Sequence, residues 1–246
     1  MSVRAPPREG EGTVVGRLDL GESDRILRLL TPDRGRVSLL ARGARAPRSR
    51  WASLDLAARV RYAARRSGSL DVLAVADVAE ARGHLRDRLE ALLPALYACE
   101  LCGALAREDH AEPRLFGLLE TALALLEASS GTPGSAFVAG LEAKALAFAG
   151  VGPVLDRCGA CDGPIEATMA YAASGLRHPR CVTEADGATV PMTGGFAAAL
   201  RAARDTPLRA LLDTALPPGP LGALADTVEA HTGRALAARA ALDVLR

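Results

Sequence analysis

The sequence predicts a multidomain α+β protein with a small β-barrel at the N-terminus, followed by a helical domain that carries a short insert. Five short apolar runs with turns between them occupy residues 13–80 and leave no room for a long helix. After His84 the apolar residues recur every three to four positions, which is typical of helices. Between residues 155 and 190 a group of Cys and His residues interrupts this pattern, so we expect a separate small element there.

Five strands are expected in the N-terminal domain. They cover residues 13–20, 24–31, 36–42, 54–65 and 69–80. Each run is rich in Val, Leu or Ile with partial alternation, and turn sequences such as TPDRG at 31–35 and RSGS at 66–69 separate them. Among barrels with five strands, the OB-fold is the commonest. The sequence therefore predicts a five-stranded OB-fold β-barrel over residues 1–80.

Helices are expected in the rest of the chain. They cover residues 85–109, 112–130, 135–150, 194–206 and 222–245. Pro113 suits the first turn of the second helix, Gly150 closes the third, and the sequence LPPGP separates the last two. The helical domain is thus expected in three pieces, a first part at 81–154, the insert at 155–190 and a C-terminal part at 191–246.

The charge of the chain is unevenly distributed. Residues 1–66 contain 15 Arg against 7 Asp and Glu, a net charge of +8, which leaves −7 for the other 180 residues of a chain whose net charge is +1. No uncharged apolar run reaches eighteen residues, and the N-terminus MSVRAPPREGEG lacks the apolar region of a secretory signal. We therefore expect a cytoplasmic protein without a membrane span.

Four potential metal ligands form two pairs with the same spacing, Cys158 with Cys161 and His178 with Cys181. Zinc prefers thiolates and imidazoles in a tetrahedron, and four protein ligands leave no open position for catalysis. Five cysteines are an odd number for a disulfide framework, which favours metal binding. We expect a structural zinc ion that holds an insert too small to bury its own core. The alternative is two surface pairs that bind no metal.

Cys99 and Cys102 form another C-x-x-C pair, within an expected helix. Among leucines on one helix face, both are expected to be buried as small apolar side chains. The alternative is that they join Cys158 and Cys161 in a four-thiolate site, which would leave His178 outside.

The basic segment predicts a nucleic-acid surface. Between Arg34 and Arg66 there are ten arginines and a single acid, Asp55. Guanidinium groups stay charged and donate two hydrogen bonds at once, which suits phosphates. Trp51 and Tyr62 are the few aromatic candidates for stacking on bases. The expected DNA-binding residues are Arg34, Arg36, Arg42, Arg45, Arg48, Arg50, Trp51, Arg61, Arg65 and Arg66. The alternative is a solvated loop that only keeps the protein soluble.

Two other classes of function are weighed against this one. A zinc-dependent hydrolase or deaminase is disfavoured, because H-E-x-x-H, Walker and G-x-S-x-G motifs are absent from the sequence. A zinc-knuckle interaction protein, such as a transcription or ribosome accessory factor without DNA-annealing activity, remains as the alternative. We expect that the protein is not an enzyme.

The order of parts, from a basic barrel through helices and a cysteine-containing insert to closing helices, resembles the RecO family of bacterial recombination mediators. The stretches that carry the likeness are residues 20–50, GVGPVLDRCGACDGP at 150–164 and HTGRALAARAAL at 231–242. Many zinc-bearing members of that family have a cysteine where His178 stands, and the resulting Cys3His set is equally suited to zinc.

The resemblance implies functions and partners. A member of this family would bind single- and double-stranded DNA, anneal complementary strands and, with RecR, help load RecA onto DNA coated by single-stranded DNA-binding protein. It would work on DNA in the nucleoid. It would also capture the acidic, apolar C-terminal tail of that coating protein, and cations must meet the tail's carboxylate. The candidates are Arg180, Arg234 and Arg239, whose alternative role is that of solvated helix positions.

Overall fold

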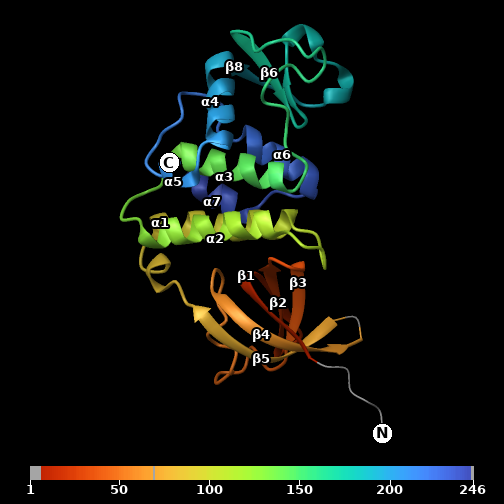
Figure 1. Ribbon diagram of the computed structural model, residues 1–246, viewed down its shortest axis with the longest axis vertical. Helices are drawn as coiled ribbons and strands as arrows, with labels where there is room; N and C mark the ends of the chain where they lie inside the picture. Colours follow the sequence, from red (N-terminus) through yellow and green to blue (C-terminus); the bar gives the residue numbers. More distant parts are fainter. Residues whose placement is uncertain (1–6, 69, 245–246) are drawn as a thin grey trace. The chain divides into compact units, whose positions relative to one another are not determined.

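The computed structural model describes residues 7–68 and 70–244. The chain forms two compact units, with the boundary between Leu123 and Ala124. Figure 1 shows the strands of the N-terminal unit and the helices and small sheet of the C-terminal unit. Within the described ranges, no helix combines the length and the apolar character that a membrane crossing requires.

The N-terminal unit begins with a closed five-stranded barrel (Figure 1). Its strands are β1 (Arg8–Leu20), β2 (Asp24–Thr31), β3 (Gly35–Ala41), β4 (Arg59–Ser67) and β5 (Leu70–Glu80). The strand order is β1-β2-β3-β5-β4, and pairing of β1 with β4 closes the barrel. Strands β3 and β5 pair in parallel, through Leu39 opposite Asp71 and Leu40 opposite Val72. The predicted five-stranded, OB-like barrel is confirmed.

Two predicted strands begin elsewhere. Strand β1 starts at Arg8 instead of residue 13, and its first residues include Gly10, where a Cβ atom would lie 2.9 Å from the Tyr62 hydroxyl. Strand β4 starts at Arg59 instead of residue 54. The apolar residues before it are turn residues whose side chains still enter the core, as Leu54 does. These buried loop residues therefore give the sequence the same apolar pattern as a strand.

The barrel core follows the alternation of the strands. In β3, Val37, Leu39 and Ala41 point inward between partly exposed residues. The indole of Trp51, from the connection between β3 and β4, completes this core. The connection between β3 and β4 is thus attached to the barrel interior through an aromatic side chain.

Helices α1 (Leu89–Leu105) and α2 (Pro113–Ala128) follow the barrel. Helix α1 packs against β1, where a Cβ atom on Gly103 would lie 2.9 Å from Cγ2 of Val15. Glu120 of α2 accepts hydrogen bonds from Thr13 at 2.5 Å and from Arg82 at 2.7 Å. A largely buried carboxylate with two donors is well satisfied, so Glu120 fixes α2 to the start of the barrel.

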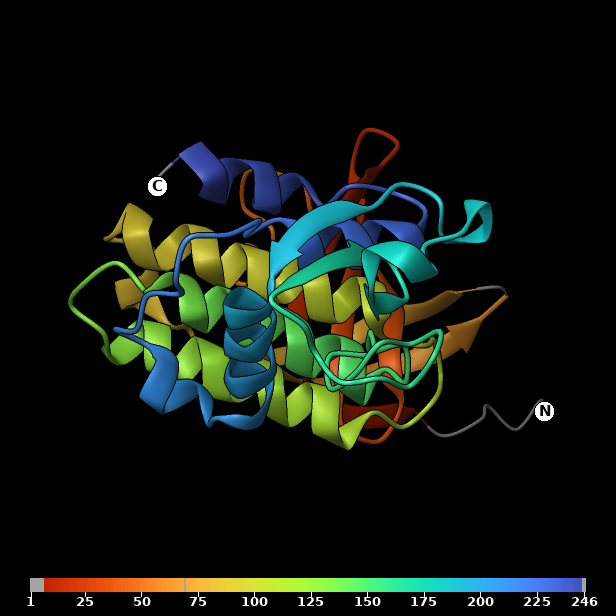
Figure 2. The ribbon, with the colours of Figure 1, turned by 90° about the horizontal axis from the view of Figure 1, so that it is seen from above.

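The described part of the C-terminal unit contains α-helices that follow α2, two short 3-10 helices and a small sheet. The α-helices are α3 (Ser135–Phe148), α4 (Gly194–Asp205), α5 (Leu208–Leu211), α6 (Ala223–Thr232) and α7 (Ala237–Val244). The sheet, in the order β7-β6-β8, contains β6 (Thr168–Ala172), β7 (Gly175–Arg177) and β8 (Val190–Thr193). Strand β8 leads directly into α4 (Figure 2). The helical stretch predicted at 222–245 is two helices, because Gly233 takes a φ of 72° and ends α6.

Candidate nucleic-acid groove and metal centre

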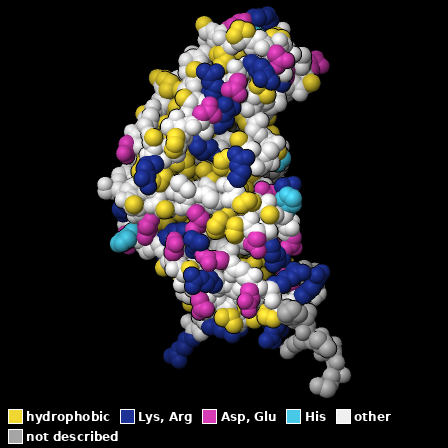
Figure 3. Space-filling view, in the orientation of Figure 1, with side chains coloured by type: hydrophobic (Ala, Val, Ile, Leu, Met, Phe, Trp, Pro, Cys, Tyr) yellow, Lys and Arg dark blue, Asp and Glu magenta, His cyan; other side chains and the backbone are white. Residues whose placement is uncertain are grey.

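Several arginines predicted to bind DNA have carboxylate partners within the N-terminal unit. Arg34 donates to Asp109 at 2.9 Å, Arg45 lies 3.3 Å from Asp19, and Arg61 lies 3.3 Å from Glu11. On the face of this unit seen in Figure 3, basic and acidic side chains are interspersed. The positive charge of these arginines is therefore largely balanced locally.

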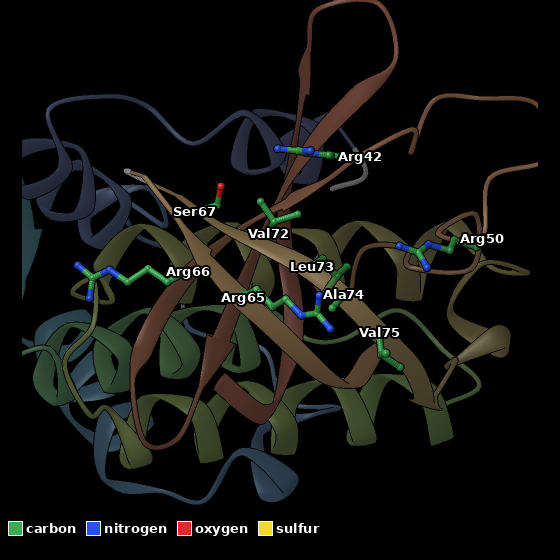
Figure 4. Close-up of a pocket in the computed structure, with 9 residues that line it drawn as sticks. All are labelled: Arg42, Arg50, Arg65, Arg66, Ser67, Val72, Leu73, Ala74 and Val75. Atoms are coloured by element: carbon green, nitrogen blue, oxygen red, sulfur yellow. The ribbon is translucent and has the colours of Figure 1, made fainter. Parts of the chain in front are cut away.

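Four other arginines line one groove of about 480 Å³ on the barrel surface (Figure 4). The lining residues are Arg42, Arg50, Arg65, Arg66, Ser67, Val72, Leu73, Ala74 and Val75. None of them is acidic, and none of these arginines forms an ion pair within the described part of the chain. The groove thus joins an apolar floor to four uncompensated guanidinium groups, which is the chemistry that binds a polyanion.

The walls of the groove come from different elements. The connection between β3 and β4 supplies Arg42 and Arg50, while the end of β4 supplies Arg65 and Arg66. Residues 60, 62 and 64 of β4 point into the core, so Arg65 points outward, and Arg66 lies past the buried part of the strand. In Figure 4, Arg50 and Arg65 extend toward each other from the two sides of the β5 residues. Two segments far apart in sequence therefore face one groove.

The remaining predicted residues of this region lie outside the groove. Arg45 is turned toward the connection between β1 and β2, where its backbone N–H donates to Ser23 at 3.0 Å. Arg36 donates to the carbonyl of Gly103 at 3.2 Å, and Arg48 is exposed on the loop. Trp51 is only 6% exposed and packs in the barrel core. Tyr62 is buried as well.

The four predicted metal ligands converge in the C-terminal unit. One ligand atom from each of Cys158, Cys161, His178 and Cys181 lies within 4.8 Å of all the others. The sulfur of Cys161 is 3.3 Å from Nδ1 of His178, and that of Cys181 is 3.9 Å from the same nitrogen. In a tetrahedral site with Zn–S distances of about 2.3 Å, the ligand atoms lie about 3.5 to 4 Å apart. The donor set therefore fits zinc.

The surroundings of the cluster orient its ligands. Nε2 of His178 lies 2.8 Å from the carbonyl of Pro164 and donates to it, which leaves Nδ1 as the acceptor that faces the sulfurs. Although burial raises the pKa of the Cys158 thiol, backbone N–H groups of His178, Ala160 and Cys161 outweigh it and lower the pKa to about 6. A thiolate and a neutral imidazole are the forms that bind a metal ion.

The turn that carries the first two cysteines also requires a glycine. The N–H of Cys158 donates to the carbonyl of Gly163 at 2.9 Å, and this closes the turn. A Cβ atom on Gly163 would lie 2.9 Å from Cε1 of His178. Any side chain there would push the imidazole away from the sulfurs, so the turn and the cluster depend on each other.

Cys99 and Cys102 are not part of this cluster. Both lie in α1 and are buried, and burial raises the pKa of Cys99 to about 12 and that of Cys102 further still. Such thiols are protonated at neutral pH and are poor metal ligands. With His178 among the converging atoms, the four-thiolate alternative finds no support.

The three arginines considered for a partner's tail have different surroundings. Arg180 forms a two-pronged pair with Glu166, at 3.0 and 2.7 Å. Arg234 is exposed between α6 and α7. Arg239 is buried and lies 3.0 Å from Glu142. The guanidinium of Arg239 is therefore committed to the interior of the C-terminal unit.

The sequence analysis did not identify a hollow of about 270 Å³ in the C-terminal unit. It is lined by Ala143, Ala147, Gly150, Gly152, Pro153, Leu155 and Arg204. Arg204 pairs with Asp156 and Asp205, which raises its pKa. The small residues at 143–152 could have indicated this hollow. They do not stand out in the sequence, because alanine is abundant throughout the chain.

Comparisons with known proteins agree with this architecture. The family model described as "Recombination protein O N terminal" matches residues 8–82, and "Recombination protein O C terminal" matches residues 86–239. A "DNA repair protein RecO" of Anaeromyxobacter sp. (strain K) is 39% identical, with 94% of each chain covered. A protein of that name from Symbiobacterium thermophilum is 32% identical over 72% of each chain. One from Myxococcus xanthus is 36% identical over 63% of this chain and 64% of its own.

Proposed function

The chain belongs to the recombination protein O (RecO) family, and from this premise we propose that it is a DNA-binding recombination mediator that anneals complementary strands. The observation that carries the proposal is the groove of Arg42, Arg50, Arg65 and Arg66. None of these four arginines forms an ion pair among the residues that the structure describes, so their charge is available to phosphates. The substrates that fit are single- and double-stranded DNA.

Annealing needs no bond to be made or broken. Two strands repel each other through their phosphates, and a cationic groove lowers this repulsion while releasing bound counterions. The lining of the groove has no aromatic or amide side chain that would hold a base. We infer that the groove binds the sugar-phosphate backbone and leaves the base edges free to pair, as a non-enzymatic annealing protein requires.

Family membership supports further partners. We propose that the protein acts with RecR to load RecA onto single-stranded DNA coated by single-stranded DNA-binding protein, and that it works in the cytoplasm at the nucleoid. We place recognition of the acidic tail of the coating protein in the C-terminal unit. The exposed Arg180 and Arg234 remain candidates for the tail. The hollow offers apolar surface, but the charge of Arg204 in its lining is paired with Asp156 and Asp205.

We propose that Cys158, Cys161, His178 and Cys181 hold a structural zinc ion. Four protein ligands leave no coordination position for a substrate, so the ion's contribution is to fix the fold of residues 155–190. The strands of the small sheet are only five, three and four residues long, and a tetrahedral cross-link compensates for a small core.

A zinc-knuckle interaction protein without annealing activity is the second candidate. One measurement distinguishes the two candidate functions, because only a recombination mediator needs to bring two DNA strands together. Labelled complementary oligonucleotides, mixed with and without the purified protein, should anneal faster with it at low salt. The acceleration should fade as salt rises. A protein that binds no DNA in about 50 mM salt would favour the interaction module instead.

A further inference from the structure

We propose that Trp51 is a positioning residue of the DNA groove, which holds Arg42 and Arg50 in one wall, and that it does not stack on bases. This inference rests on the proposed function and assigns a role to the only tryptophan of the chain. Trp51 does not line the groove itself, whereas both of the arginines that it contacts do.

The indole makes one contact with each arginine. Its Nε1–H donates to the backbone carbonyl of Arg42 at 3.0 Å, which fixes the residue from which that side chain projects. The guanidinium of Arg50 lies over the ring, 4.1 Å from its centre. A guanidinium over an indole face is held by a cation–π interaction, which is strongest with tryptophan. One side chain therefore positions two charges.

The indole is itself fixed by the barrel. It is 6% exposed and packs in the core cluster with residues such as Leu39, Leu54 and Val60. Because the core is closely packed, the position of the ring is fixed relative to the strands that share this core. The arginines thereby acquire a fixed place relative to β4 and β5, although they belong to an exposed segment.

Other contacts also hold this loop. The N–H of Gly43 donates to Asp24 at 2.9 Å, and that of Arg45 donates to Ser23 at 3.0 Å. Both contacts attach the loop to the connection between β1 and β2. Arg65 and Arg66 need no such anchor, because they belong to a strand. Trp51 adds a contact from the barrel core that reaches both Arg42 and Arg50. Preorganised side chains lose less freedom on binding, so this contact should strengthen DNA binding.

A double-mutant cycle tests the inference. Trp51→Phe keeps a ring for Arg50 and for the core but removes the N–H, and it should weaken binding of a single-stranded oligonucleotide by about threefold to tenfold. In an Arg42→Ala background the same change should have a much smaller effect, because only its action through Arg50 remains. In an Arg25→Ala background, which removes a charge paired with Asp19, it should keep its full effect.

The fold of each variant is checked by urea unfolding, since Trp51 is also a core residue. If Trp51→Phe does not fold, replacing the only tryptophan biosynthetically by benzothienylalanine keeps the shape and removes only the donor. A purely structural role would weaken binding equally in all backgrounds, and that outcome, or an unchanged affinity, overturns the inference. If the wild-type protein binds no DNA, the proposed function itself fails. Weakening by Arg42→Ala without an effect of Trp51→Phe refutes the positioning role alone.

Discussion

The guanidinium of Arg239 in α7 lies 3.0 Å from the carboxylate of Glu142 in α3, and both side chains are buried. Arg239 also donates to the carbonyl of Leu221 at 3.1 Å. A buried charge is tolerated only when it is paired and hydrogen-bonded, so the two residues depend on each other. This pair attaches the last described helix to the centre of the C-terminal unit.

Arg239→Ala should lower the free energy of unfolding by about 3 to 5 kcal/mol, because it leaves Glu142 as an uncompensated buried charge. Arg234→Ala is the matched control, since Arg234 is exposed on the same stretch, and its effect should stay within about 0.5 kcal/mol. Urea unfolding followed by circular dichroism measures both. Equal stability of the two variants would mean that the ion pair does not support the fold.

Trp51 should be shielded from solvent and from DNA. With the ring 6% exposed, acrylamide should quench its fluorescence far less than that of free tryptophan, and saturating single-stranded DNA should change the emission only slightly. A base that stacks on an indole must contact its face directly. Strong quenching by DNA would therefore show that the ring leaves the core to meet a base.

Metal removal should affect the C-terminal unit and spare the groove. Purified protein should contain one zinc ion per chain, and Cys158→Ser should lose it, because that sulfur belongs to the converging set. Chelation should lower the melting temperature, since the ion binds only the folded form. DNA affinity should change much less, because the groove residues belong to the other unit. Zinc retained after Cys158→Ser and Cys181→Ser together would refute the site.

Cys99 should resist alkylation and should make stability fall at high pH. Burial raises its pKa from the ordinary 9.0 to about 12, so the reactive thiolate is scarce in the folded protein at pH 8. Because the folded pKa is the higher one, the contribution of this thiol is complete below pH 9 and is lost as the pH rises toward 12. Mass spectrometry after iodoacetamide treatment, with and without urea, should show labelling of Cys99 only in urea. Rapid labelling in the native state would contradict its burial.

Much of the fold was accessible from the sequence because periodicity reports burial. The alternation in β3 and the helical spacing at 194–205 each reflect one buried face. The residues at which strands and helices begin and end were harder to predict. Leu54 has the character of a strand residue but is buried from a turn, and the helix-breaking role of Gly233 depends on its φ of 72°.

The metal ligands were predictable because their chemistry and spacing are local to two short turns. The charge balance of the arginines was not. Arg45 meets Asp19 and Arg34 meets Asp109 through pairings of distant segments, and such partners are invisible in a linear count of charge. For the same reason, the burial of Trp51 was hidden by its place among exposed arginines.

The central claim is that the groove, and not the general basicity of the barrel, binds DNA. Its most direct test compares two variants that lose the same charge. One replaces the groove residues Arg42, Arg50, Arg65 and Arg66 by Ala. The other replaces four ion-paired arginines of the barrel by Ala, namely Arg17, Arg25, Arg45 and Arg61.

The measurement is the slope of the logarithm of the single-stranded DNA binding constant against the logarithm of salt concentration. The groove variant should lose about 0.7 units of slope per phosphate contact, or roughly 3 units for four contacts, while the control should stay near the wild-type slope. Equal losses in the two variants would contradict the central claim, because they would show that net charge alone governs binding.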